Sequence, residues 1–120
     1  MVNYDDFCNE VLDLDKSIRY VAVVNDGKTY AKMAQTTKNL LNPKESSESI
    51  NDAIPRWKTR KKLAVKLGEP VYAMAVYKKI KRITLPFDQN GVILVSMNPD
   101  GFHQIIIDEL AEIKYKYFDA

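Results

Sequence analysis

The hydrophobic positions near the N-terminus follow helical spacing and then change to strand-like spacing. An apolar stripe at i, i+3, i+4, i+7 and i+8 predicts the first helix: Tyr4, Phe7, Cys8, Val11 and Leu12. Asn3 can cap this helix with its side chain. The β-branched and aromatic run 17–24 predicts a strand, and a return strand is expected over 29–34 after an Asn-Asp-Gly-Lys turn. Because both faces of the first strand are largely apolar, we expect it to lie centrally in a sheet.

A long helix is expected in the middle of the chain. Asn42 can be its N-cap and Glu45 completes a capping box, while Gly68 and Pro70 are typical of a helix end. Pro55 lies between these signals, where it removes one backbone hydrogen bond and clashes with the preceding turn. We therefore expect a kinked helix, or two helices in series that meet near Pro55.

Three strand-like runs follow, over 71–77, 80–87 and 92–97. The Asp-Gln-Asn-Gly sequence at 88–91 predicts a hairpin between the last two runs, since Asn-Gly is the strongest short hairpin signal. The two lysines at 78–79 provide no such signal. The first two runs therefore form either a second hairpin or one long strand with a bulge.

The last helix is expected after Asp100, which can cap it. Its apolar stripe consists of Phe102, Ile106, Leu110, Ile113 and Tyr117. A helix this apolar either packs broadly on a sheet or shares a subunit interface. The elements together predict an α+β fold in a single domain over residues 1–120, in the order α-β-β-α-β-β-β-α, with helices packed on an antiparallel sheet of about five strands.

The composition of the chain restricts the chemistry that it can perform. With 120 residues, 46% of them hydrophobic, it can bury a core without a metal or a disulfide. A single histidine, His103, and a single cysteine, Cys8, cannot build a structural zinc site or a Cys/His nucleophile pair with residues to spare. All four glycines fall at turns or helix ends, so none is left for a phosphate-binding loop, and we expect no enzyme activity and no cofactor. Without a membrane-length apolar run or a signal peptide, we expect a cytoplasmic protein.

The net charge of +2 conceals a segregated distribution. Residues 1–55 carry −3, residues 56–82 carry +9 and residues 83–120 carry −4. Within this basic segment (56–82), the candidate partner-binding residues are Arg56, Arg60, Lys61, Lys62, Lys78, Lys79, Lys81 and Arg82. Such a patch attracts an acidic protein, a lipid head group or nucleic acid, of which nucleic acid is the weaker candidate. The alternative is a solvated helix face with edge-strand lysines that prevent aggregation.

Five further side chains are of types that can have a functional role. Trp57 lies on the apolar stripe of the middle helix and is interpreted as a core anchor, and Cys8 is interpreted as a small core residue. Tyr72 and Tyr77 either flank a groove or, as we expect, pack on a two-sided sheet. For His103, in the first turn of the last helix, we expect an exposed or capping role.

Two segments carry a family resemblance. The apolar strand, Asn-Asp-Gly turn and second strand over 18–34 resemble the start of a roadblock domain, and Val-Ile-Leu-Val-Ser at 92–96 resembles its last central strand. The element order likewise resembles the roadblock/longin group of profilin-like folds. A set of small archaeal proteins of the same plan is also similar over the segments Arg56 through Lys62, Leu67-Gly68, Tyr72-Ala73, Tyr77 and Ile80-Lys81-Arg82.

This resemblance implies a sheet order of 2-1-5-4-3, a homodimer, and a non-catalytic adaptor or regulator of small GTPases and motors. The basic segment and Pro55 depart from the roadblock pattern. PAS-like sensors share the layout, so a small-ligand sensor with a pocket between the sheet and the middle helix is one alternative function. A nucleic-acid-binding domain that uses residues 56–82 is another.

Overall fold

Two strands that are distant in sequence form the centre of an antiparallel sheet. The structure is a computed structural model that describes residues 3–35, 37–87 and 91–119. In it β1 (Ile18–Asn25) pairs with β5 (Gly91–Met97), from Ile18 opposite Met97 to Asn25 opposite Gly91. The predicted central position of the first strand is therefore confirmed, and its β-branched residues are buried on both faces.

Three further strands complete the sheet. β2 (Lys28–Met33) pairs with β1, β4 (Lys81–Phe87) pairs with β5, and β3 (Ala73–Val76) pairs with β4. The sheet order is β2-β1-β5-β4-β3, which confirms the expected five-stranded α+β fold and leaves β2 and β3 as its edges.

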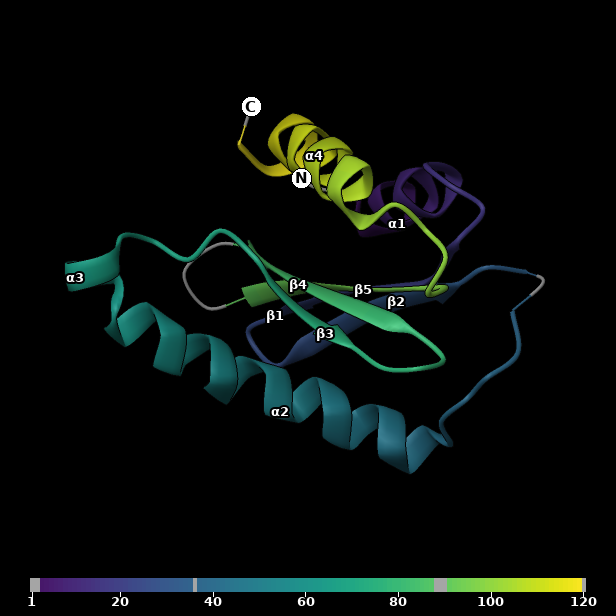
Figure 1. Cartoon of the computed structure of the whole chain (residues 1–120), viewed down its shortest axis with the longest axis horizontal. Helices are drawn as coiled ribbons and strands as arrows, with labels where there is room; N and C mark the ends of the chain where they lie inside the picture. Colours follow the sequence, from purple (N-terminus) through teal and green to yellow (C-terminus); the bar gives the residue numbers. More distant parts are fainter. Residues whose placement is uncertain (1–2, 36, 88–90, 120) are drawn as a thin grey trace.

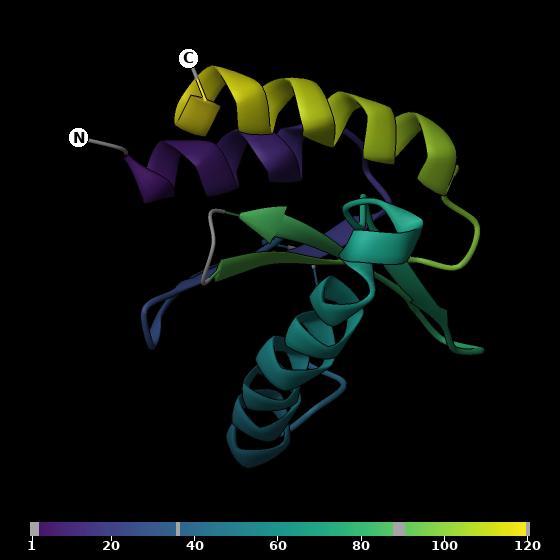
Figure 2. The same ribbon diagram turned by 90° about the vertical axis from the view of Figure 1, so that its left-hand side faces the viewer.

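The helices cover the two faces of the sheet unequally. α1 (Tyr4–Asp13) and α4 (His103–Lys114) lie side by side on one face, and α4 continues into a π-helical turn, η1 (Tyr115–Asp119). α2 (Pro43–Lys62) covers the other face alone and is followed by the short α3 (Ala64–Leu67). Both views show α2 approaching the sheet at its C-terminal half and diverging from it toward its N-terminus (Figures 1 and 2).

Alternation along the strands divides the core between these faces. On β5, Ile93 and Val95 point into the larger cluster beneath α1 and α4, while Val92 belongs to a smaller cluster with Trp57 and Ala53 of α2. Because successive side chains of a strand point to opposite faces, one strand supplies both clusters. The apolar side of α4 is thus used in packing on the sheet and α1.

The helix caps follow the sequence, and Pro55 lies inside a single helix. Asn42 and Glu45 form a reciprocal capping box at the start of α2. The helix then runs without interruption through Pro55, and the change to a second helix occurs at Leu63, so the expected junction near Pro55 is wrong. The residue is tolerated because it is exposed, as is Asn51, whose carbonyl loses its helical partner and can bind water instead.

The last helix also begins later than expected. α4 starts at His103, and no side chain caps it, so Asp100 is not the cap. Phe102 precedes the helix and is 78% exposed, while Ile106, Leu110 and Ile113 are buried as predicted.

Two of the predicted turns are present among the described residues. Asp26 and Gly27 both adopt positive φ, at 51° and 78°, which a tight two-residue turn between β1 and β2 requires. β3 and β4 form a hairpin in which the Tyr77 amide donates to the Ile80 carbonyl at 2.8 Å, so the single long strand with a bulge is excluded. The 88–91 turn lies outside the described residues except for Gly91.

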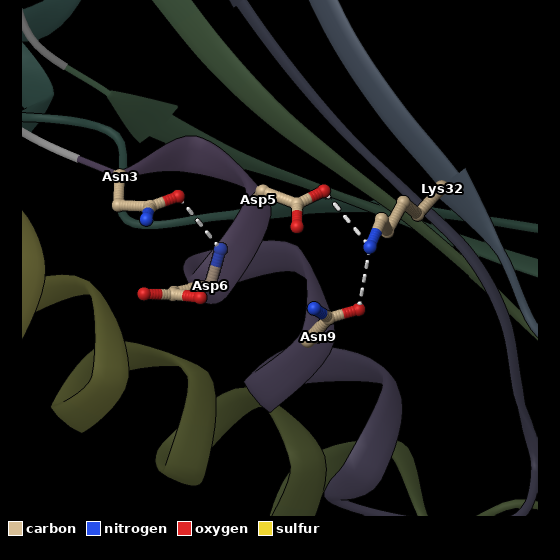
Figure 3. A network of polar contacts seen from close by, with 5 residues as sticks. All are labelled: Asn3, Asp5, Asp6, Asn9 and Lys32. Carbon is tan, nitrogen blue, oxygen red and sulfur yellow. Dashed lines mark hydrogen bonds and ion pairs between the residues drawn. The ribbon is translucent and has the colours of Figure 1, made fainter.

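α1 is fixed to the edge strand β2 by a small polar network (Figure 3). Lys32 of β2 places its Nζ 2.8 Å from Oδ1 of Asp5 and 2.9 Å from Oδ1 of Asn9. Asn3 caps the same helix, since its Oδ1 accepts from the Asp6 amide at 3.1 Å. One exposed edge of the sheet is thereby held against a helix.

We expect Ile93→Ala to lower the free energy of unfolding by about 3 kcal/mol, because it removes buried atoms from a side chain with no solvent exposure. Urea denaturation would measure the loss. Ile105→Ala is the matched control: this side chain is 59% exposed, so the loss should stay below about 1 kcal/mol. Equal losses in the two variants would contradict the placement of the core.

Candidate functional site

The cations of the basic segment lie in several separate places in the structure. Lys81 and Arg82 are neighbours on β4 and therefore point to opposite faces of the sheet. Lys81 donates to the carbonyl oxygen of Gly101 at 3.0 Å and lies 3.2 Å from Nδ1 of His103, on the α4 face. Arg82 instead reaches toward α2, where its Nη1 donates to the hydroxyl of Ser49.

The remaining candidate cations fall into three groups, two along α2 and one on the β3–β4 turn. Arg56 and Arg60 line a cleft between α2 and the sheet, together with Arg82. Lys61 and Lys62 lie at the C-terminal end of α2, whereas the turn with Lys78 and Lys79 lies toward the opposite end of the long axis (Figure 1). The predicted patch is therefore not one continuous surface, and only three of its members share the cleft.

The cleft offers a volume and a lining that suit a small ligand. It has a volume of about 190 Å³ and is bounded by α2 from Ser46 to Arg60, by the sheet and by the segment 37–41. α2 rests on the sheet through the small side chain of Ala53 and through Trp57, beyond which its N-terminal half diverges. The cleft occupies the space that this divergence leaves.

The floor of the cleft consists of two cross-strand rows. Tyr20, Ser96 and Arg82 are direct register partners across β1, β5 and β4, so their side chains share one face. The next row on that face pairs Leu94 with Thr84. Polarity therefore falls from the first row to the second, in the direction of the apolar cluster around Trp57.

A second candidate feature is an apolar segment that extends from α3, at one end of the long axis, along the edge strand β3 to the β3–β4 turn (Figure 1). Of the twelve large hydrophobic side chains that are exposed among the described residues, seven lie within residues 63–77. We call this the α3–β3 surface, and it consists of Leu63, Val65, Leu67, Val71, Tyr72, Val76 and Tyr77. Val65 is 95% exposed and Val76 is 64% exposed. Exposed apolar side chains along an open sheet edge, such as Val76 and Tyr77 at the end of β3, are typical of a protein interface.

Sequence reasoning missed Arg19 as a site residue. Arg19 sits at an irregularity in the β1–β5 register, between Ile18 and Tyr20, and lines the cleft. Its guanidinium donates to Oδ1 of Asn98 at 2.9 Å and to the carbonyl oxygen of Lys38 at 3.0 Å. The available signal was a lone arginine within an otherwise apolar strand.

The other singled-out side chains have structural roles. Trp57 is 3% exposed and anchors α2, and Cys8 is 1% exposed in the core, as predicted. Tyr72 and Tyr77 are 38% and 54% exposed, so the expected packing within the sheet is wrong, and Tyr77 lines the cleft. His103 is half-buried beside Lys81. Within the described ranges, no three acidic, His or Cys side chains come together in a way that could hold a metal ion.

The fold is similar to solved structures of one group. The Roadblock/LC7 domain from Streptomyces avermitilis matches with a TM-score of 0.73 at 8% identity, over 93% of this chain and 92% of that chain. A structure described as MglB with tetrameric arrangement matches with a TM-score of 0.64 at 13% identity, over 95% and 89% of the two chains. The chain has the roadblock fold.

The structure is also similar to a profilin-like protein. LokiProfilin1, in a complex with rabbit actin, matches with a TM-score of 0.56 at 16% identity, over 96% of this chain and 93% of that one. No model of a protein family matches the chain, and no curated protein sequence does. At such low identities the likeness establishes the fold alone, and the resemblance to small archaeal proteins stays a prediction. Among the described helices, none combines the length and apolarity that crossing a membrane requires.

We expect the Cys8 thiol to be inert in the native protein. Burial raises the pKa of this thiol to about 11, so the reactive thiolate is scarce near neutral pH. Ellman's reagent at about pH 8 should therefore react slowly with the native protein and rapidly in guanidinium chloride. Fast stoichiometric reaction in native buffer would contradict the buried position.

Proposed function

We propose that this roadblock-fold chain is a non-catalytic regulatory adaptor that acts through protein–protein contacts as a homodimer. The observation that carries the proposal is the difference between the two edges of the sheet. Unpaired edges recruit further strands unless charge, proline or a covering element prevents it. One edge of this sheet is protected in that way and the other is open.

The protected edge is β2. It carries Lys28 and Lys32, and Lys32 is held by Asp5 and Asn9 of α1 (Figure 3). The open edge is β3, whose sequence Ala-Met-Ala-Val contains neither charge nor proline. It is flanked by the α3–β3 surface, so an additional strand at β3 would bury exposed side chains such as Val76 and Tyr72.

A second copy of the chain is the partner that suits this edge best. Two identical strands can pair antiparallel about a two-fold axis, and the same apolar patch then meets itself. The tetrameric arrangement of the MglB structure with this fold supports assembly between copies. The actin complex of LokiProfilin1 supports protein binding as the mode of action.

The exposed cations of the basic segment are candidates to contact a further, acidic protein partner at separate points, and the roadblock resemblance suggests a small GTPase for this partner. Lys62 and Lys79 are exposed, and the segment has a net charge of +9. A positive field of this kind accelerates and selects binding to an acidic surface.

We expect the parent chain to have twice its 13.8 kDa mass in size-exclusion chromatography with light scattering at micromolar concentration. Val76→Glu should elute as a monomer, because it places a charge in the open edge where strands would pair. Ile105→Glu is the matched control, since Ile105 is 59% exposed on α4 and does not belong to a strand edge, and this variant should remain dimeric. A monomeric parent chain, or a dimeric Val76→Glu variant, would refute the proposed interface.

Charge reversal tests the acidic partner separately. In a pull-down at physiological salt, Lys62→Glu combined with Lys79→Glu should reduce the captured partner severalfold, because like charges then face each other. Lys16→Glu combined with Lys44→Glu makes the same change in net charge at exposed lysines outside the segment and should leave capture unchanged. Equal capture by both variants would exclude the basic segment as the binding surface.

A further inference from the structure

We infer that the cleft between α2 and the sheet binds a small amphiphilic anion, a molecule with one acidic head group and an apolar body. The inference goes beyond the proposed adaptor role and does not depend on the dimer. It rests on the charge of the lining, on the order of polar and apolar rows on the floor, and on the volume of the cleft.

The lining is strongly one-sided in charge. Five cations contribute to it, and none of the described lining residues is an Asp or a Glu; the five are Arg19, Lys38, Arg56, Arg60 and Arg82. Arg19 and Arg82 are half-buried, and neither forms an ion pair with a carboxylate that the structure describes. Guanidinium groups removed from water without a counter-charge are costly, so an anion bound between them is stabilised.

The existing contacts orient these two guanidiniums without neutralising them. Arg19 donates to the side-chain oxygen of Asn98 and to a backbone carbonyl, and Arg82 donates to the Ser49 hydroxyl. All three acceptors are uncharged. A guanidinium has five N–H donors in a planar fork, so donors remain for a carboxylate or a phosphate.

Neutral donors accompany these cations on the floor. Ser96 lies directly beside both Tyr20 and Arg82 in the sheet register. Burial raises the pKa of the Tyr20 phenol, with Arg82 opposing the shift in part, so this group stays protonated at neutral pH. The polar row can therefore provide hydroxyl donors as well as positive charge to an acidic head group.

The remainder of the cleft suits an apolar body. Beyond the polar row the floor continues with Leu94, and α2 contributes Ile50 and Ala53 opposite it. The volume of about 190 Å³ exceeds the ~150 Å³ of a cavity that holds benzene and lies below the range of drug-sized pockets. A ligand of about ten non-hydrogen atoms fits these limits.

Octanoate and octyl phosphate are suitable probes, with octan-1-ol as the uncharged control. Binding would be followed by isothermal titration calorimetry and by NMR chemical shifts of the backbone amides. We expect saturable binding of at least one anion at millimolar concentration or below, with shifts at Ser96, Arg82 and Ser49. The alcohol should bind about tenfold more weakly, since it cannot use the charged contacts. The tighter of the two anions identifies the head group, and either result supports the proposal.

Two variants locate the site. Arg82→Gln should weaken binding of the anion about tenfold, while Lys79→Gln removes the same charge from the exposed β3–β4 turn and should have no effect. Ala73→Leu should block binding by filling the apolar part without any change in charge, since Ala73 lines the cleft. Circular dichroism confirms that each variant is folded.

The outcomes separate this site from the dimer. Binding that persists in the monomeric Val76→Glu variant supports a ligand site within one chain. Equal affinity for octanoate and octan-1-ol, shifts confined to other regions, or the absence of saturable binding would overturn the inference.

Discussion

The antiparallel pairing of β1 with β5 is the contact on which the rest of the structure depends. These strands are separated by most of the chain, yet they pair along their whole length and are buried on both faces. Along this pairing, successive rows of side chains point alternately toward α1 and α4 and toward α2. A shift of one residue in the register would therefore turn each row to the opposite face of the sheet. The positions of all helices, and of β2 and β4 on either side, follow from this register.

The two faces of the central sheet are stabilised differently. The α1 and α4 face has a dense core with an aromatic cluster in which Phe118 packs against Phe7 and Phe87, at centroid distances of 4.8 and 4.3 Å. Lys116 and Tyr117 hydrogen-bond to Glu10 and lower the pKa of its carboxyl, which joins η1 to α1. The α2 face rests on a much smaller cluster around Trp57. Packing constraints are weaker there, and this is the face on which the cleft and its arginines occur.

The open edge and the basic cleft of this domain adjoin each other at β3. The open β3 edge and the α3–β3 surface lie at the end of the sheet, while the cleft lies between its middle and α2. A contact between copies at β3 and a ligand beneath α2 would share the strands β3 and β4. Both proposed contacts would therefore act on the same hairpin.

The amino-acid sequence by itself determined the secondary structure, the caps and the two-sided character of the central strands. Asn3, Asn42 and Gly27 act locally, so their effects can be derived from neighbouring residues alone. Pro55 was the exception: its effect depended on whether the surrounding carbonyls face water, which is a property of the folded helix. The start of α4 was similarly decided outside the local pattern, with Phe102 left exposed.

Only the tertiary structure decided which side chains meet. Tyr20, Ser96 and Arg82 come from three strands far apart in sequence, and their register partnership makes them one polar row. The cations of the basic segment are close in sequence, yet the alternation of β4 and the length of α2 separate them. The pattern of apolar residues over 63–77 does not show whether another element covers their side chains. The exposure of these side chains therefore could not be derived from the sequence. Local sequence signals thus specified the helices and strands. The candidate sites arose from the strand register and from which surfaces the helices cover, because both depend on contacts between segments that are distant in sequence.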